Sequence, residues 1–186
     1  MCAPSALKKA SVVISLCCLG ILCAGQNTSG PEATVDETEL ANATIVKKKI
    51  QSIVQATLKE GEFTTADGIK ATTRVPPSAE RIEEVKQLGK SAIPVLAAYA
   101  NSESPRAQEL AMRFLAGIGG DRIVEPLRGF AKHSAFPSNR AEAVMFLVET
   151  PLSRALPIIE DVSKTDPDPY VRKTASELFI KYSRTD

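Results

Sequence analysis

The sequence predicts an all-α protein, an α-solenoid of about three and a half stacked helix pairs. The first observation is that apolar residues recur every 32 positions in the second half of the chain. Three columns show this spacing: Ala111, Ala143 and Ala175; Phe114, Phe146 and Leu178; and Leu115, Leu147 and Phe179. A fixed period of roughly 20 to 50 residues indicates a repeat array, in which stacked neighbours share one continuous core.

The second observation is that helix-start signals recur at similar places in each repeat. A side-chain oxygen at a helix start accepts a hydrogen bond from an otherwise unpaired backbone N–H. The residues expected in this role are Ser78, Ser104, Ser138 and Asp168 for first helices, with second helices after Ser91, Asp121 and Ser153. The predicted helices span 78–89, 91–100, 105–116, 121–131, 139–149, 153–162 and 169–182, within a repeat domain of residues 78–186.

Residues 1–25 have the layout of a secretory signal peptide. Lys8 and Lys9 precede an apolar run over 11–22, and small residues before Gln26 suit a cleavage site. The run is shorter than the roughly 20 residues of a membrane-spanning helix. We therefore expect a bacterial exported protein, periplasmic or extracellular, with a retained N-terminal anchor as the alternative.

All cysteines lie in this segment, at Cys2, Cys17, Cys18 and Cys23. The mature chain would then form no disulfide, so its stability must come from packing. A lipid on Cys23 or Cys17 remains an alternative, although Leu22 and Leu16 stand where bacterial lipoproteins carry a small residue. Membrane contact is expected only through such a lipid or an uncleaved signal.

Three segments separate the signal from the repeats. Residues 26–39 are polar and predict a flexible linker, and residues 40–77 predict an N-terminal helix followed by an extended strap. One face of the helix is apolar, at Val46, Ile50, Ile53, Val54 and Leu58, and Gly61 ends it. The strap is Thr-rich, and Asp67-Gly68 favours a short hairpin turn within it.

Composition excludes several classes of function. Lys and Arg number 23 against 22 Asp and Glu, which argues against a general nucleic-acid binder. The single histidine, His133, is expected at the surface near a helix end. Acidic groups such as Glu80, Glu83 and Glu84 are typical of a solvated helix face. We expect no catalytic residue, no cofactor and no metal site.

Three stretches carry a family resemblance. Residues 170–179 (YVRKTASELF) resemble the first helix of a HEAT repeat, and residues 115–127 resemble its turn and second helix. Residues 88–96 resemble a shorter-turn variant common in bacterial members. The resemblance covers about residues 78–186, and it implies a right-handed superhelix whose second helices line a concave, partner-binding face.

The repeats also depart from the family pattern. The Arg at position 172 has a counterpart in Arg140, but Gln108 occupies the first equivalent position. Gly119-Gly120 has no counterpart in the next repeat. These departures predict an incomplete ladder of buried polar groups between repeats.

The second-helix face supplies the candidate partner-binding residues: Arg122, Arg128, Lys132, Arg154, Glu160 and Lys164. Arg122 and Arg154 are 32 positions apart and predict a two-step basic ladder suited to carboxylates. The leading hypothesis is a non-enzymatic scaffold or adaptor for a protein or peptide in the cell envelope. The alternatives are an enzyme or enzyme subunit resembling HEAT-like bilin lyases, and a structural envelope component held by its N-terminus.

We expect the exported chain to begin at Gln26, because signal peptidase removes residues 1–25. Mass spectrometry of the N-terminus, on protein isolated from its host, checks this. A chain that still carries residues 1–25 would point to the retained anchor, and an acyl group on a cysteine would point to a lipoprotein.

Overall fold

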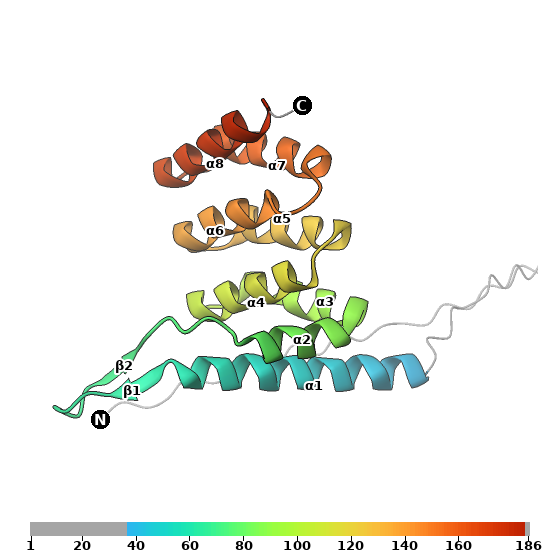
Figure 1. Ribbon diagram of the computed structural model, residues 1–186, viewed down its shortest axis with the longest axis vertical. Helices are drawn as coiled ribbons and strands as arrows, with labels where there is room; N and C mark the ends of the chain where they lie inside the picture. The colour runs from blue at the N-terminus through green and yellow to red at the C-terminus, as the bar shows by residue number, and fades with distance from the viewer. Residues whose placement is uncertain (1–36, 185–186) are drawn as a thin grey trace, which may run out of the picture. The chain divides into compact units, whose positions relative to one another are not determined.

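The computed structural model describes residues 37–184, which form a stack of helix pairs beside one long helix (Figure 1). The helices are α1 (Glu37–Glu60), α2 (Ala79–Gln87), α3 (Ala92–Ala97), α4 (Pro105–Ile118), α5 (Val124–His133), α6 (Pro137–Leu147), α7 (Leu152–Thr165) and α8 (Pro169–Tyr182). Short 3-10 turns span Gly89–Ser91, Ala98–Asn101 and Asp121–Ile123. The all-α solenoid is confirmed, and the predicted signal peptide lies outside the described residues.

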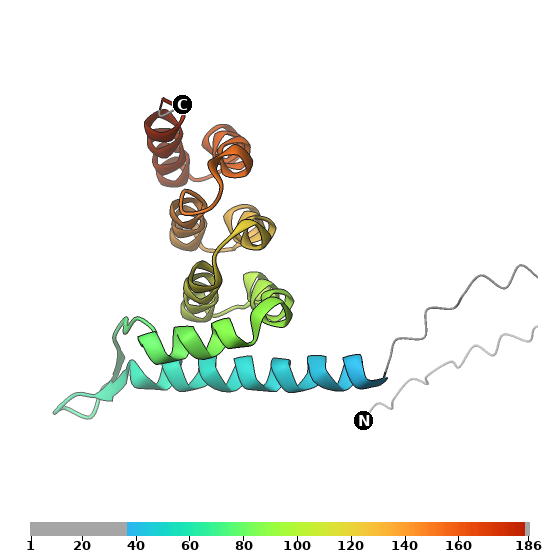
Figure 2. The same ribbon diagram turned by 45° about the vertical axis from the view of Figure 1, so that its right-hand side comes forward.

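The helices form two columns. First helices α4, α6 and α8 stand above α2 on one side, and second helices α3, α5 and α7 stand on the other (Figure 2). Helix α1 lies across the start of the array, where it contacts α3 and α4. No helix within residues 37–184 is long and apolar enough to cross a membrane.

The predicted apolar columns form the core. Ala111, Ala143 and Ala175 are all fully buried. A small side chain suits this column, because the interior between stacked helices is closely packed. Leu96, Leu127 and Ile159 make a matching buried column on the second helices. In the two wider columns, Phe114, Leu115 and Leu147 are buried, whereas Phe146, Leu178 and Phe179 are partly buried.

A ladder of polar side chains runs through the turns between repeats. Gln108, Arg140 and Arg172 each donate a hydrogen bond to the carbonyl of the residue six positions earlier, at 2.7, 3.0 and 2.7 Å. The acceptors belong to Ser102, Ser134 and Asp166, which recur every 32 residues. Each turn carbonyl therefore has a donor, as a polar group away from water requires.

The same turns are linked to one another across repeats. The Ser134 hydroxyl donates to Gln108 Oε1 at 2.5 Å, and Arg140 binds both carboxylate oxygens of Asp166 at 2.8 and 3.0 Å. Gln108 therefore forms a neutral pair with Ser134, whereas Arg140, at the equivalent position of the next repeat, forms a charged pair with Asp166. The expectation of an incomplete ladder was wrong, because the partner residue changes together with the ladder residue.

The N-terminal strap forms the expected hairpin. Strands β1 (Glu62–Thr64) and β2 (Lys70–Thr72) pair antiparallel around Gly68, which has the positive φ that a tight turn requires. The strap returns past the end of α1, where a Cβ on Gly61 would lie 2.4 Å from the Thr73 carbonyl oxygen. Glycine at position 61 is therefore required by the close approach of the two segments.

One of the four predicted first-helix caps differs from the structure, and no predicted second-helix start residue makes a capping bond. Ser78, Ser104 and Asp168 accept backbone N–H groups as expected. Ser138 lies inside α6, which begins at Pro137, and Ser134 binds the Phe136 N–H instead. Ser91 and Asp121 lie in the 3-10 turns that lead into α3 and α5, and neither makes a capping bond. Ser153 lies inside α7, which begins at Leu152. Helix α1 begins at Glu37, three residues before the expected start at position 40.

We expect Asp166→Asn to lower the free energy of unfolding by about 3 kcal/mol, because Arg140 would stay buried without its carboxylate partner. Burial raises the pKa of Asp166, but hydrogen bonds from Arg140 and from the Asp168 N–H outweigh burial and hold that pKa below its usual value. The carboxylate therefore stabilises the fold above its unfolded pKa of about 4, and this contribution is lost as the pH falls through the folded pKa.

Urea unfolding of both proteins between pH 7 and pH 3 measures this. Wild type should lose stability toward acid more steeply than Asp166→Asn. Glu177→Gln is the control, since the Glu177 carboxylate is exposed and lies 3.9 Å from Lys173, and it should change stability by less than about 0.5 kcal/mol. Equal acid slopes in wild type and Asp166→Asn would contradict the role given to this carboxylate.

Candidate functional site

The six predicted partner-binding residues lie on the second-helix side of the array. Arg122 is in the 3-10 turn before α5, and the other five lie on α5 and α7. Their side chains are exposed or half-exposed. The stacking of the repeats brings them onto neighbouring helices, as the 32-residue spacing predicts.

Most of these residues are already paired. Arg128 binds Glu125 at 3.1 Å, Lys164 binds Glu160 at 2.6 Å, and Lys132 pairs with Asp161 on the next helix. Positive and negative groups therefore alternate along this surface. Surface pairs of this kind add roughly 0 to 1 kcal/mol each, so they remain available to a partner.

The predicted basic ladder is broken by carboxylates. Arg154 lies 3.8 Å from Glu125 and 4.0 Å from Asp121, and it also donates to the Asp121 carbonyl at 3.3 Å. Within residues 37–184, no hydrogen bond or ion pair involves the Arg122 side chain. Arg154 faces the carboxylates of Asp121, in the 3-10 turn before α5, and Glu125, on α5, so this surface carries charges of both signs.

Hollows follow the C-terminal ends of the second helices. One of about 350 Å³ lies between the turn at Asn101 and Ser102 and the turn at Phe136. A second, of about 220 Å³, lies between the ends of α5 and α7, and a third, of about 350 Å³, lies along α5. His133 lines all three, because it ends α5 at the surface where these hollows meet.

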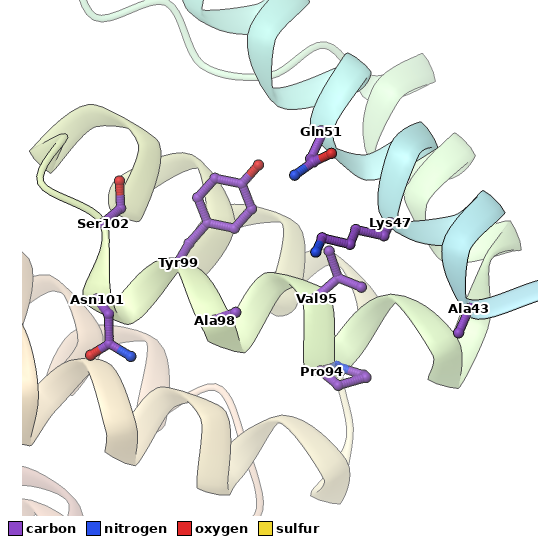
Figure 3. A pocket seen from close by; sticks show the side chains of 9 residues that line it. All are labelled: Ala43, Lys47, Gln51, Pro94, Val95, Ala98, Tyr99, Asn101 and Ser102. Carbon is purple, nitrogen blue, oxygen red and sulfur yellow. The ribbon is translucent and has the colours of Figure 1, made fainter. Parts of the chain in front are cut away.

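A larger groove lies between α1 and α3. It measures about 600 Å³ and is lined by Ala43, Lys47, Gln51, Pro94, Val95, Ala98, Tyr99, Asn101 and Ser102. The side chains of Lys47, Gln51 and Tyr99 point toward the gap between the two helices (Figure 3). Asn101 and Ser102 also line the next hollow, so the groove continues along the second-helix side.

A different cluster of charges lies on the first-helix side. The buried Glu109 carboxylate on α4 has three guanidinium groups within 3.4 Å, from Arg74, Arg106 and Arg113. Arg113 also binds Glu142 of α6 at 2.8 Å. Arg106 donates to a strap carbonyl, at Val75, so this arginine cluster ties the strap to two repeats.

The electrostatics of the cluster suit a structural role. Burial raises the pKa of Glu109, but hydrogen bonds from Arg106 and Arg113 and the charges of Arg106 and Arg74 outweigh burial and hold that pKa below its usual value. Burial and the charge of Glu109 raise the pKa of Glu142. Sequence analysis missed this cluster, although Arg106, Glu109 and Arg113 share one helix face at i, i+3 and i+7. No sequence spacing predicts the contribution of Arg74, since the strap that carries it reaches α4 only in the folded chain.

The described residues contain no group of three His, Cys, Asp or Glu side chains placed to hold a metal ion. Glu80, Glu83 and Glu84 lie on α2, where Glu84 pairs with Lys49 at 3.2 Å. Asp166 and Asp168 are engaged in the ladder and in capping α8. The carboxylates considered in the sequence are therefore used in helix surfaces and turns.

Antiparallel helix pairs that repeat every 32 residues, with hollows on the second-helix side, define an α-solenoid of the kind that presents a long surface. Residues 93–178 match the family model of HEAT repeats, so the chain contains a HEAT-repeat domain. No curated protein matches the chain.

We expect Glu109→Gln to destabilise the protein by about 3 kcal/mol, because Arg106 would lose its buried carboxylate partner. The strap should then detach more often, so limited proteolysis should cleave residues 62–77 faster. Glu142→Gln makes the same chemical change one repeat further on. It should cost less, since the folded environment already favours a neutral group there. Equal rates of strap cleavage in wild type and both variants would show that the arginine cluster does not hold the strap.

Proposed function

We propose that this chain is a non-enzymatic scaffold or adaptor that binds a protein or peptide partner along its second-helix side. HEAT repeats are commonly protein-interaction scaffolds. The observation that carries the proposal is the row of hollows from α1 to α7, in which neighbouring hollows share Asn101, Ser102 or His133. A row of this kind suits an extended segment of another chain.

The charge pattern supports a protein as the partner. Positive groups on α5 and α7 alternate with acidic ones, such as Lys132 with Asp161 and Lys164 with Glu160. A nucleic acid needs a continuous basic surface, whereas a protein can present charges of both signs. Such rim charges contribute mainly to specificity and association rate.

The first-helix side suits this role less well. Its charged residues near the strap are held in the arginine cluster, with Glu109 buried. Breaking these contacts to bind a partner would leave charges unpaired in the interior, which is costly. The second-helix side has no comparable cost, because its ion pairs are exposed.

We further propose that the protein acts outside the cytoplasm, in the cell envelope. The support is the sequence of residues 1–25, with its basic start, apolar run and small residues before Gln26. A partner would then be another exported protein or an exposed part of a membrane protein.

Crosslinking in the host identifies the partner, and binding of the purified pair then tests the surface. We expect Arg122→Glu with Arg154→Glu to weaken binding by about tenfold, because two positive groups at the edge of the second-helix side become negative. Lys86→Glu with Lys173→Glu makes the same charge change on α2 and α8 and should leave the affinity unchanged. Equal effects of the two double variants would show that the partner does not use the second-helix side.

A further inference from the structure

Helix α1 lies outside the residues that match the HEAT repeats. Its middle packs on the array through Ile50, Ile53 and Val54, which are buried. Its N-terminal part continues past this contact, and Leu40 there is 62% exposed. The groove of about 600 Å³ described above lies along this part of α1 and has α3 as its other wall.

The groove has an apolar part and a polar part, and both walls contribute to each. Val95 and Ala98 on the array and Ala43 on α1 form an apolar floor. Lys47 is the one charged residue among those that line the groove, and its amine points into the gap with the Gln51 amide and the Tyr99 hydroxyl (Figure 3). An apolar floor with hydrogen-bond donors at one edge is complementary to an apolar group that carries a carboxylate nearby.

The donors are available in the folded protein. Within residues 37–184, Lys47 makes no ion pair, whereas Lys49, two positions further on, binds Glu84 at 3.2 Å. Burial raises the pKa of Tyr99, so its hydroxyl stays protonated and can donate. The charge of the groove is therefore positive and is not neutralised by a described acidic residue.

Two features connect the groove to a polypeptide ligand. Leu40 lies one turn before Ala43 on the same face of α1, so the apolar wall extends beyond the groove. At the other end, Asn101 and Ser102 line both the groove and the next hollow of the second-helix side. A bound chain could therefore pass from the groove along the row of hollows without leaving the surface.

We propose that the groove between α1 and α3 is the anchor site for the partner, where it holds a bulky apolar side chain followed by an acidic residue. This inference rests on the proposed function, because it assumes a polypeptide partner on the second-helix side. The apolar side chain fills the floor formed by Val95, Ala98 and Ala43, and the acidic residue pairs with Lys47. A few well-enclosed contacts of this kind supply most of the affinity of an interface.

Three synthetic peptides test the site: acetyl-Gly-Ser-Leu-Phe-Glu-Ser-Gly-amide, the same peptide with Lys for Glu, and the same peptide with Ala-Ala for Leu-Phe. Each is titrated into the full chain labelled with ¹⁵N. We expect the first peptide to change the chemical shifts of the Ala43, Lys47, Ala98 and Asn101 amides until the site is saturated. The other two should bind at least about tenfold more weakly.

Variants of α1 separate the charge effect from the apolar effect. Lys47→Glu should weaken the acidic peptide about tenfold and should come to prefer the lysine peptide. Lys48→Glu is the matched control, since it makes the same change on the same helix outside the groove, and it should bind as wild type does. Ala43→Trp should block all three peptides by filling the groove.

Several results would overturn the proposal. These are equal binding of the three peptides, equal effects of Lys47→Glu and Lys48→Glu, and no saturation by the acidic peptide up to about 5 mM. Saturation of the same amides by decanoate but not by peptide would assign the groove to lipids instead. If Ala43→Trp leaves partner binding intact while Arg122→Glu with Arg154→Glu weakens it, the anchor site fails but the proposed function stands.

Discussion

The stacking of this protein depends on side chains that bind the turn carbonyls between repeats. Gln108, Arg140 and Arg172 each supply a donor to the turn before their own helix. Gln108 and Arg140 also reach the next turn, at Ser134 and Asp166. The apolar core favours stacking but has little directional preference, whereas these hydrogen bonds allow one register between neighbouring repeats. The ladder therefore sets how the repeats align, and every surface formed by two repeats follows from it.

The two sides of the array have different physical roles as a result. On the first-helix side, the buried Glu109 carboxylate binds Arg74, Arg106 and Arg113. Arg113 also binds Glu142 of α6, so one charge cluster connects the strap with two repeats. On the second-helix side, ion pairs such as Lys164 with Glu160 remain exposed to water. The first arrangement is costly to disturb and the second is not. This difference separates the part of the surface that maintains the fold from the part that can exchange its contacts for a partner.

Helix α1 closes the start of the array and also shapes the surface beside it. An array of stacked repeats exposes apolar side chains at its ends unless a cap covers them. Ile50, Ile53 and Val54 provide this cover at the start. At the other end, α8 leaves Ile180 47% exposed. Because α1 is longer than the pair it covers, its free part becomes one wall of a groove, so a capping helix gains a surface that the repeats alone would lack.

The sequence by itself determined the repeat length, the helix pairs, the apolar columns and the side of the array on which the six candidate residues lie, because packing follows from local periodicity and from side-chain size. It also identified caps such as Ser104 and Asp168, whose bonds join residues a few positions apart. Only the tertiary structure decided the pairing of Gln108 with Ser134, the approach of Arg74 to Glu109, and the groove between α1 and α3. These contacts join residues far apart in the chain, and their existence depends on how helices stack, which no local pattern of residues specifies.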